Sequence, residues 1–110
     1  MDMREQEKHN EMAKIVRSKE AKAAIEEALH NLDPNALTNK GKIKSYEIDE
    51  KSISHNPMGG IGLTLYINGD KSLKNRIILD KNNGKLEVGS GVVSGKLDDY
   101  LSDIREGERW

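Results

Sequence analysis

The spacing of the apolar residues changes near Asn39-Lys40-Gly41, and this change constrains the fold more than any other feature of the chain. Before it, residues 4–32 contain neither glycine nor proline and are rich in Glu, Lys, Ala, Met and Leu, which favour helix. After it, the apolar residues recur with a period close to two, which is typical of strands. The sequence therefore predicts a helical region followed by a sheet.

The apolar residues of the helical region form two stripes. At about 100° per residue, one stripe consists of Met12, Ile15, Val16 and Ala23. The second stripe lies nearly opposite and consists of Ala21, Ile25, Ala28, Leu29 and Leu32. One straight helix cannot pack both stripes against one core. We expect either a break near Arg17-Ser18-Lys19, with Ser18 capping a second helix, or a first segment that buries its stripe elsewhere.

The region after Gly41 predicts four antiparallel strands. They are residues 43–49, 61–67, 73–79 and a short strand around Leu86 and Val88. The second strand alternates most clearly, and its core-facing residues are Ile61, Leu63, Leu65 and Ile67. Asn68-Gly69-Asp70 and residues 81–84 are turn signals that join neighbouring strands as hairpins. The result is a meander.

The last part of the chain predicts a helix. The glycine-rich residues 89–95 lack the Lys-Ser/Thr ending of a phosphate loop, so we expect a hinge or a β-bulge there. Beyond them, helical spacing joins Leu97, Tyr100, Leu101 and Ile104, and Gly107 ends the pattern. The predicted fold class is α+β, with an N-terminal helix or kinked helix pair, a four-stranded antiparallel meander and a C-terminal amphipathic helix. The helices are expected on one face of the sheet.

Composition limits the classes of function. The chain has 110 residues, which fits one domain, residues 1–110, with residues 1–17 as a candidate stalk or membrane-proximal helix. Its 18 basic and 19 acidic residues are mixed along the chain, without the basic stripe of a nucleic-acid binder. It contains no cysteine, and its three histidines, His9, His30 and His55, lack the spacing of zinc ligands. We therefore expect no nucleic-acid partner, no metal and no cofactor.

Two segments are candidate binding sites. The first is the loop predicted between the first two strands, whose candidate residues are His55, Asn56, Pro57, Met58, Gly59 and Gly60. Loops held by rigid strands often carry binding residues, although Asn-Pro and Gly-Gly are also ordinary turn chemistry. The second is a candidate association face formed by Met12, Ile15 and Val16. Its alternative is a kinked helix that buries the whole stripe.

Three stretches of the sequence resemble a known family. They are residues 43–49, residues 55–60 and residues 66–71, with sequences IKSYEID, HNPMGG and YINGDK. The chain is similar to a family of small Gram-positive bacterial proteins carried as a domain of unknown function. The resemblance implies an N-terminal signal or membrane anchor ahead of the charged helix, and an extracytoplasmic, membrane-anchored or secreted location. A native start at Met1 would instead favour the cytoplasm.

These observations favour a non-enzymatic, membrane-tethered interaction module. Its partner would be a protein, a peptide or an envelope component, bound through the His55–Gly60 loop, a strand edge or a helix-lined groove. Membrane contact would come only through an anchor outside this chain, and the module would be a monomer or a weak dimer. One alternative is a small hydrolase or lyase that uses His55 as base with Asp49, Glu50 or Asp70. The other is a cytosolic dimeric regulatory domain paired through the Met12 stripe.

Overall fold

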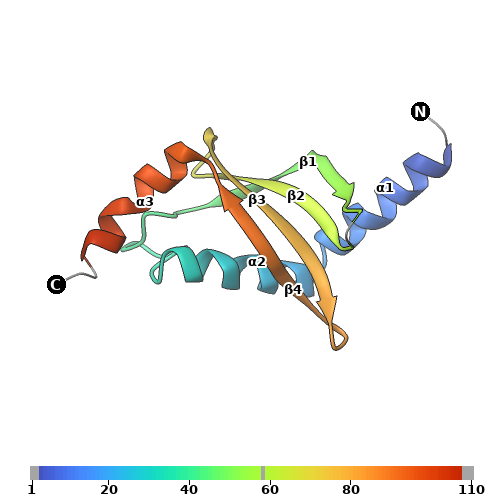
Figure 1. Cartoon of the computed structure of the whole chain (residues 1–110), viewed down its shortest axis with the longest axis horizontal. Coiled ribbons are helices and arrows are strands. Elements are labelled where there is room, and N and C mark those ends of the chain that lie inside the picture. The colour runs from blue at the N-terminus through green and yellow to red at the C-terminus, as the bar shows by residue number, and fades with distance from the viewer. Residues whose placement is uncertain (1–2, 58, 108–110) are drawn as a thin grey trace.

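A computed structural model describes the backbone of residues 3–57 and 59–107, and the side chains of residues 6–57 and 59–102. The elements, in chain order, are α1 (Met3–Val16), α2 (Lys19–Leu32), β1 (Tyr46–His55), β2 (Ile61–Ile67), β3 (Asp70–Asn82), β4 (Lys85–Val93) and α3 (Gly95–Gly107). The strands form one antiparallel sheet in the order β1-β2-β3-β4 (Figure 1). The predicted α+β fold with a four-stranded meander is confirmed. None of the described helices is long and apolar enough to cross a membrane.

The helical region breaks where the sequence predicted. Ser18 has extended backbone angles, and its Oγ accepts a hydrogen bond of 3.1 Å from the N–H of Ala21. The same hydroxyl donates to the carbonyl of Ile15 at 2.6 Å. Because one serine side chain closes α1 and caps α2, the two helices differ in direction, and Val16 of the first stripe packs in the same core as Ile25 and Leu29 of the second. Ile15 and Ala23 of the first stripe stay exposed. The prediction of a break capped by Ser18 is confirmed.

The core lies between the helices and one face of the sheet. Helix α2 buries Ala21, Ala24, Ile25 and Leu29, and the sheet buries Leu63, Leu65, Ile67, Leu73, Ile77 and Leu79. Helix α3 adds Leu97 and Leu101. The opposite face of the sheet carries Thr64, Tyr66 and Arg76, which alternate with the buried positions along β2 and β3. The helices therefore cover one face, as predicted.

The glycine-rich part of β4 is a strand with a bulge. Ile78 pairs with Ser90 and Leu79 pairs with Val88, so Gly89 has no partner in the ladder. The expected bulge is confirmed, but the fourth strand is much longer than predicted and runs from Lys85 to Val93. Strand β3 is likewise longer than the predicted residues 73–79. The two hairpin turns contain Asn68-Gly69 and Asn83-Gly84, all at positive φ as a type I′ turn requires.

Strand β1 differs most from its prediction. Residues 43–49 were expected to pair, but the strand begins at Tyr46. The backbone N–H groups just before it bond to side chains instead: that of Ile43 to Asp33 Oδ2 at 3.0 Å, and that of Lys44 to Asn68 Oδ1 at 2.7 Å. At its other end β1 continues to His55, where the sequence predicted a loop.

Asp33 ends α2 and holds the connection to β1. The residue is only 2% exposed, and its Oδ1 accepts from the N–H of Asn35 at 3.0 Å. Its Oδ2 accepts from the N–H groups of Lys42 at 2.7 Å and Ile43 at 3.0 Å. Gly41 lies so close that a Cβ there would be 2.1 Å from the Asn35 carbonyl oxygen. The Asp33 carboxylate therefore accepts the backbone hydrogen bonds that a neighbouring strand would accept if the segment before β1 belonged to the sheet.

We expect Asp33→Ala to lower the free energy of unfolding by roughly 3–5 kcal/mol, because three backbone donors at or near the core would lose their acceptor. Asp33→Asn keeps one acceptor oxygen and should cost less. Urea unfolding followed by circular dichroism would measure both. The control is Asp80→Ala at an exposed position, and a loss at Asp33 no larger than at Asp80 would contradict this role.

Candidate binding groove between α1 and β1

A wide bulge in β1 positions the candidate site. Asp49 pairs with Thr64 and Ser54 pairs with Gly62, so four residues of β1, 50–53, lie opposite one residue of β2. The extra residues push the strand out of the sheet plane. Because β1 is an edge strand, the bulge is free to meet α1. No sequence signal marked this bulge, since residues 50–53 carry neither glycine nor proline.

Helix α1 docks on this bulge through both polar and apolar contacts. The ring Nε2 of His9 lies 3.1 Å from the carbonyl oxygen of Glu50. The guanidinium of Arg17 donates to the carboxylate of Glu50, with Nε at 2.9 Å from Oε1. Both partners of this ion pair are more than half exposed, so its contribution to stability is small. The buried side chains of Ile53 and Val16 supply the larger part.

The bulge is also held from the open face of the sheet. Arg76 Nη1 donates to the carbonyl of Ser52 at 3.3 Å, and Nη2 donates to the hydroxyl of Ser54 at 3.3 Å. Gly62 lets the guanidinium lie against the backbone, because a Cβ there would be 2.6 Å from Arg76 Nη2. The bulge is therefore fixed between α1 and Arg76.

A groove of about 800 Å³ opens between α1 and the bulge. We call it the α1–β1 groove, and its lining residues are Lys8, His9, Glu11, Met12, Ile15, Ile53, Ser54 and His55. A second hollow of about 420 Å³ continues on the far side of Ile15 and reaches Gly60, Ile61 and Leu86. Ile15 is 41% exposed between the two hollows. Such exposure of a large aliphatic side chain beside further apolar surface is typical of binding surfaces.

The two candidate segments of the sequence meet in this groove. Met12 and Ile15 of the association face line one wall, and His55 of the predicted loop lines the other. Val16 instead faces inward and is 2% exposed, so it belongs to the core. The sequence named both segments without indicating that they would be neighbours. Lys8, Glu11 and Ile53 were not candidates, because contact across the groove depends on the bulge.

The predicted loop is shorter and more regular than expected. Its His55 belongs to β1, and its Met58 lies outside the described residues. Asn56 donates its N–H to the carbonyl of Gly60 at 3.1 Å, and Gly59 donates to the carbonyl of Asn56 at 2.9 Å. Gly60, at φ 84°, lies so close to β3 that a Cβ would be 2.6 Å from the Leu79 carbonyl oxygen. The glycine pair and the Asn-Pro step therefore build the turn, with exposed Pro57 at its surface.

The carboxylates proposed as partners of His55 have other contacts. Asp49 accepts from the hydroxyl of Tyr66 at 2.8 Å, and this hydrogen bond raises the pKa of Tyr66. Glu50 pairs with Arg17. Asp70 accepts from the N–H and hydroxyl of Ser72, which lowers the pKa of Asp70. Among the described side chains, no group of three or more His, Asp or Glu residues could hold a metal ion. The hydrolase or lyase alternative stays a hypothesis.

The fold and the groove define a small α+β domain with a largely apolar groove between its first helix and its first strand. The chain belongs to the family described as "Protein of unknown function (DUF1310)", which it matches over residues 1–100. The expected membership in a family of unknown function is thereby confirmed. Comparison with curated proteins and with solved structures gave no match. The Gram-positive origin and the N-terminal anchor stay predictions.

Neighbouring residues of α1 allow a direct test of which side chains are structural. Ile15→Asp should change the free energy of unfolding by less than about 1 kcal/mol, because the side chain already contacts water. Val16→Asp should cost more than about 3 kcal/mol, because it places a carboxylate in the core. Chemical unfolding of both variants would measure this. Equal losses would mean that Ile15 contributes to the core and is not available to a partner.

Proposed function

We propose that the chain is a non-enzymatic interaction module that holds an apolar segment of a protein, peptide or envelope component in the α1–β1 groove. One observation carries the proposal: Ile15 is exposed between two hollows, next to Met12 and Ile53, in a chain with 34% charged residues. The large apolar side chains supply the binding energy, and the polar rim of Lys8, Glu11 and His55 supplies orientation.

The way α1 is attached supports this use of the groove. The wall formed by α1 is anchored at its C-terminal end, where Val16 is buried and Ser18 closes the helix. Further toward the N-terminus, the contact of His9 with the Glu50 carbonyl is a surface contact. A wall that is fixed at one end can adjust its distance from β1 at the other. A binder of segments with different side-chain sizes needs such adjustment.

We further propose that the module works outside the membrane, tethered by a signal or anchor segment ahead of the charged helix. The family resemblance motivates this location. Helix α1 would then be the membrane-proximal element, which places the α1–β1 groove between the tether and the sheet. Such a position suits the capture of a membrane protein segment or an envelope component that lies close to the membrane.

A photo-crosslinking amino acid tests the groove. With benzoylphenylalanine in place of Ile15, full-length protein in its own cells should give a discrete crosslinked species, whereas the same substitution at exposed Ala23 should not. Adding Met12→Asp or His55→Ala should lower the yield at least about fivefold, since each changes a wall of the groove. Crosslinks of equal yield from both positions would contradict the proposal. A species of twice the protomer mass would support the dimeric regulator instead.

Protease treatment of intact cells tests the location independently. External protease should remove the Arg4–Trp110 portion of the full-length protein while a cytoplasmic marker stays intact. Lysed cells are the control that shows the portion can be cut. Full protection in intact cells would contradict the extracytoplasmic location but would leave the groove itself as a binding site in the cytoplasm.

A further inference from the structure

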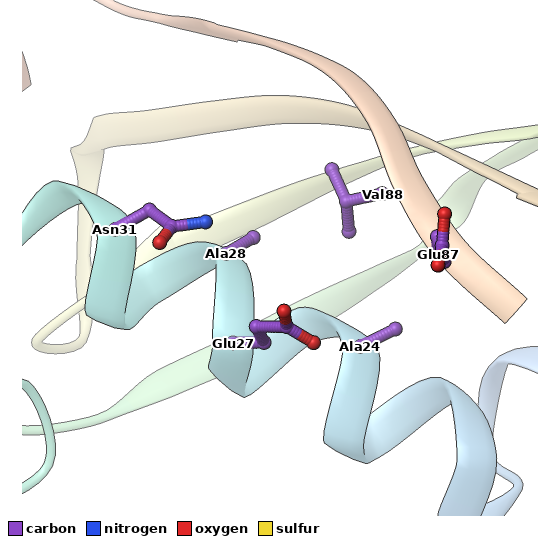
Figure 2. A pocket seen from close by; sticks show the side chains of 6 residues that line it. All are labelled: Ala24, Glu27, Ala28, Asn31, Glu87 and Val88. Atoms are coloured by element: carbon purple, nitrogen blue, oxygen red, sulfur yellow. The ribbon is translucent and has the colours of Figure 1, made fainter.

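A second groove lies between α2 and β4, on the opposite side of the molecule's core from the bulge of β1. It has two connected parts of about 180 and 200 Å³, which share Ala28, Asn31 and Val88. Figure 2 shows Val88 projecting from β4 toward α2, with Ala24 and Ala28 on the facing side of the helix. We call it the α2–β4 groove. Its small helix residues leave room for an additional chain beside the strand.

The part of this groove that borders β3 holds a buried acceptor without a donor among the described residues. Asn75 is 3% exposed on the core face of β3, and its Oδ1 has no hydrogen-bond partner among the described residues. A Cβ built at Gly91 would be 3.4 Å from this oxygen, so the oxygen faces the space that Gly91 leaves empty. A buried acceptor without a partner is costly in free energy. Its retention here points to a donor supplied from outside.

The other part of the groove is negative. Glu27 extends from α2 and Glu87 from β4, so the two carboxylates stand on opposite sides of the groove (Figure 2). Both residues are exposed, and neither forms an ion pair with a described residue. Both parts of the groove thus present hydrogen-bond acceptors, the buried Asn75 oxygen in one and two exposed carboxylates in the other. Their complement is a cation that carries several N–H donors on an aliphatic stem.

The strand that forms one wall lies at the edge of the sheet. Strand β4 is last in the sheet order, and the N–H of Leu86 points away from β3, because it donates to Glu20 Oε1 at 2.7 Å. Residues two apart on a strand direct their backbone groups to the same side, so the N–H of Val88 faces outward as well. An extended peptide can pair with such an edge and place alternate side chains in the groove.

We propose that the α2–β4 groove binds a basic, extended segment of a partner polypeptide. The segment adds to β4 as a fifth strand from Val88 onward, because the N–H of Leu86 already donates to Glu20. One lysine or arginine side chain passes between Ala28 and Val88, enters the space over Gly91 and donates an N–H to Asn75 Oδ1. The carboxylates of Glu27 and Glu87 attract the positive charge of the segment. This site is independent of the α1–β1 groove and of the partner proposed for it.

The test uses a displayed library of random peptides selected on the wild-type domain. Selected peptides should be enriched in lysine and arginine. Their affinity should fall at least about tenfold on the Glu27→Gln/Glu87→Gln double variant and on Asn75→Leu, and several-fold on Gly91→Ala, which narrows the entry. Gly95→Ala is the matched control, because Gly95 lies outside β4 and a Cβ there would have no atom within 4 Å.

Thermal unfolding of the same variants separates a binding site from a packing defect. If Asn75 Oδ1 receives a hydrogen bond only from a bound ligand, Asn75→Leu should raise the unfolding temperature of the free domain and weaken peptide binding. A higher unfolding temperature with unchanged peptide binding would show that Asn75 is a packing defect without a role in binding, and would overturn the proposal. A lower unfolding temperature would show that an internal water already satisfies Asn75, and would overturn it too. Enrichment of peptides without basic residues, or no enrichment over background, would also overturn the proposal.

Discussion

The carboxylate of Asp33 is the interaction on which the arrangement of helices and sheet depends. It lies at the end of α2 and accepts from backbone N–H groups both in the turn after the helix and just before β1. Asn68 does the same from the β2–β3 turn, accepting from Lys44 and donating to the Lys42 carbonyl. Without these acceptors, the segment between α2 and β1 would leave backbone donors unpaired at the edge of the core. The two side chains thus fix where the sheet begins relative to α2.

A second tie between α2 and β1 follows from this placement. The hydroxyl of Tyr46, the first residue of β1, donates to Glu26 of α2 at 3.3 Å. Burial, and then the neighbouring Glu26 carboxylate, raises the pKa of Tyr46 to about 12. The tyrosine therefore stays a neutral donor throughout the physiological range of pH. This end of β1 is thus held at α2, whereas the bulge lies further along the strand, where α1 covers it.

The fold could be predicted from the sequence because its signals are local. The alternation in residues 61–67 located β2, the Asn-Gly pairs located both hairpins, and Ser18 marked the break between two helices. The start of β1 could not be predicted, since it depends on Asp33 and Asn68, which bond to that segment across 10 and 24 residues of chain. The α1–β1 groove escaped prediction for the same reason: Met12 and His55 meet only because of the bulge.

The two edge strands of the sheet, β1 and β4, are covered by different helices. A free strand edge invites pairing with other chains, and proteins usually cover it, bend it or charge it. The β1 edge is bent by its bulge and covered by α1 through Glu50 and Ile53. Strand β4 instead packs against α2, and Glu20 of that helix accepts from the N–H of Leu86. Because Glu20 already accepts from Leu86, the partner strand proposed above pairs with β4 from Val88 onward, where the edge lies beside the acidic groove.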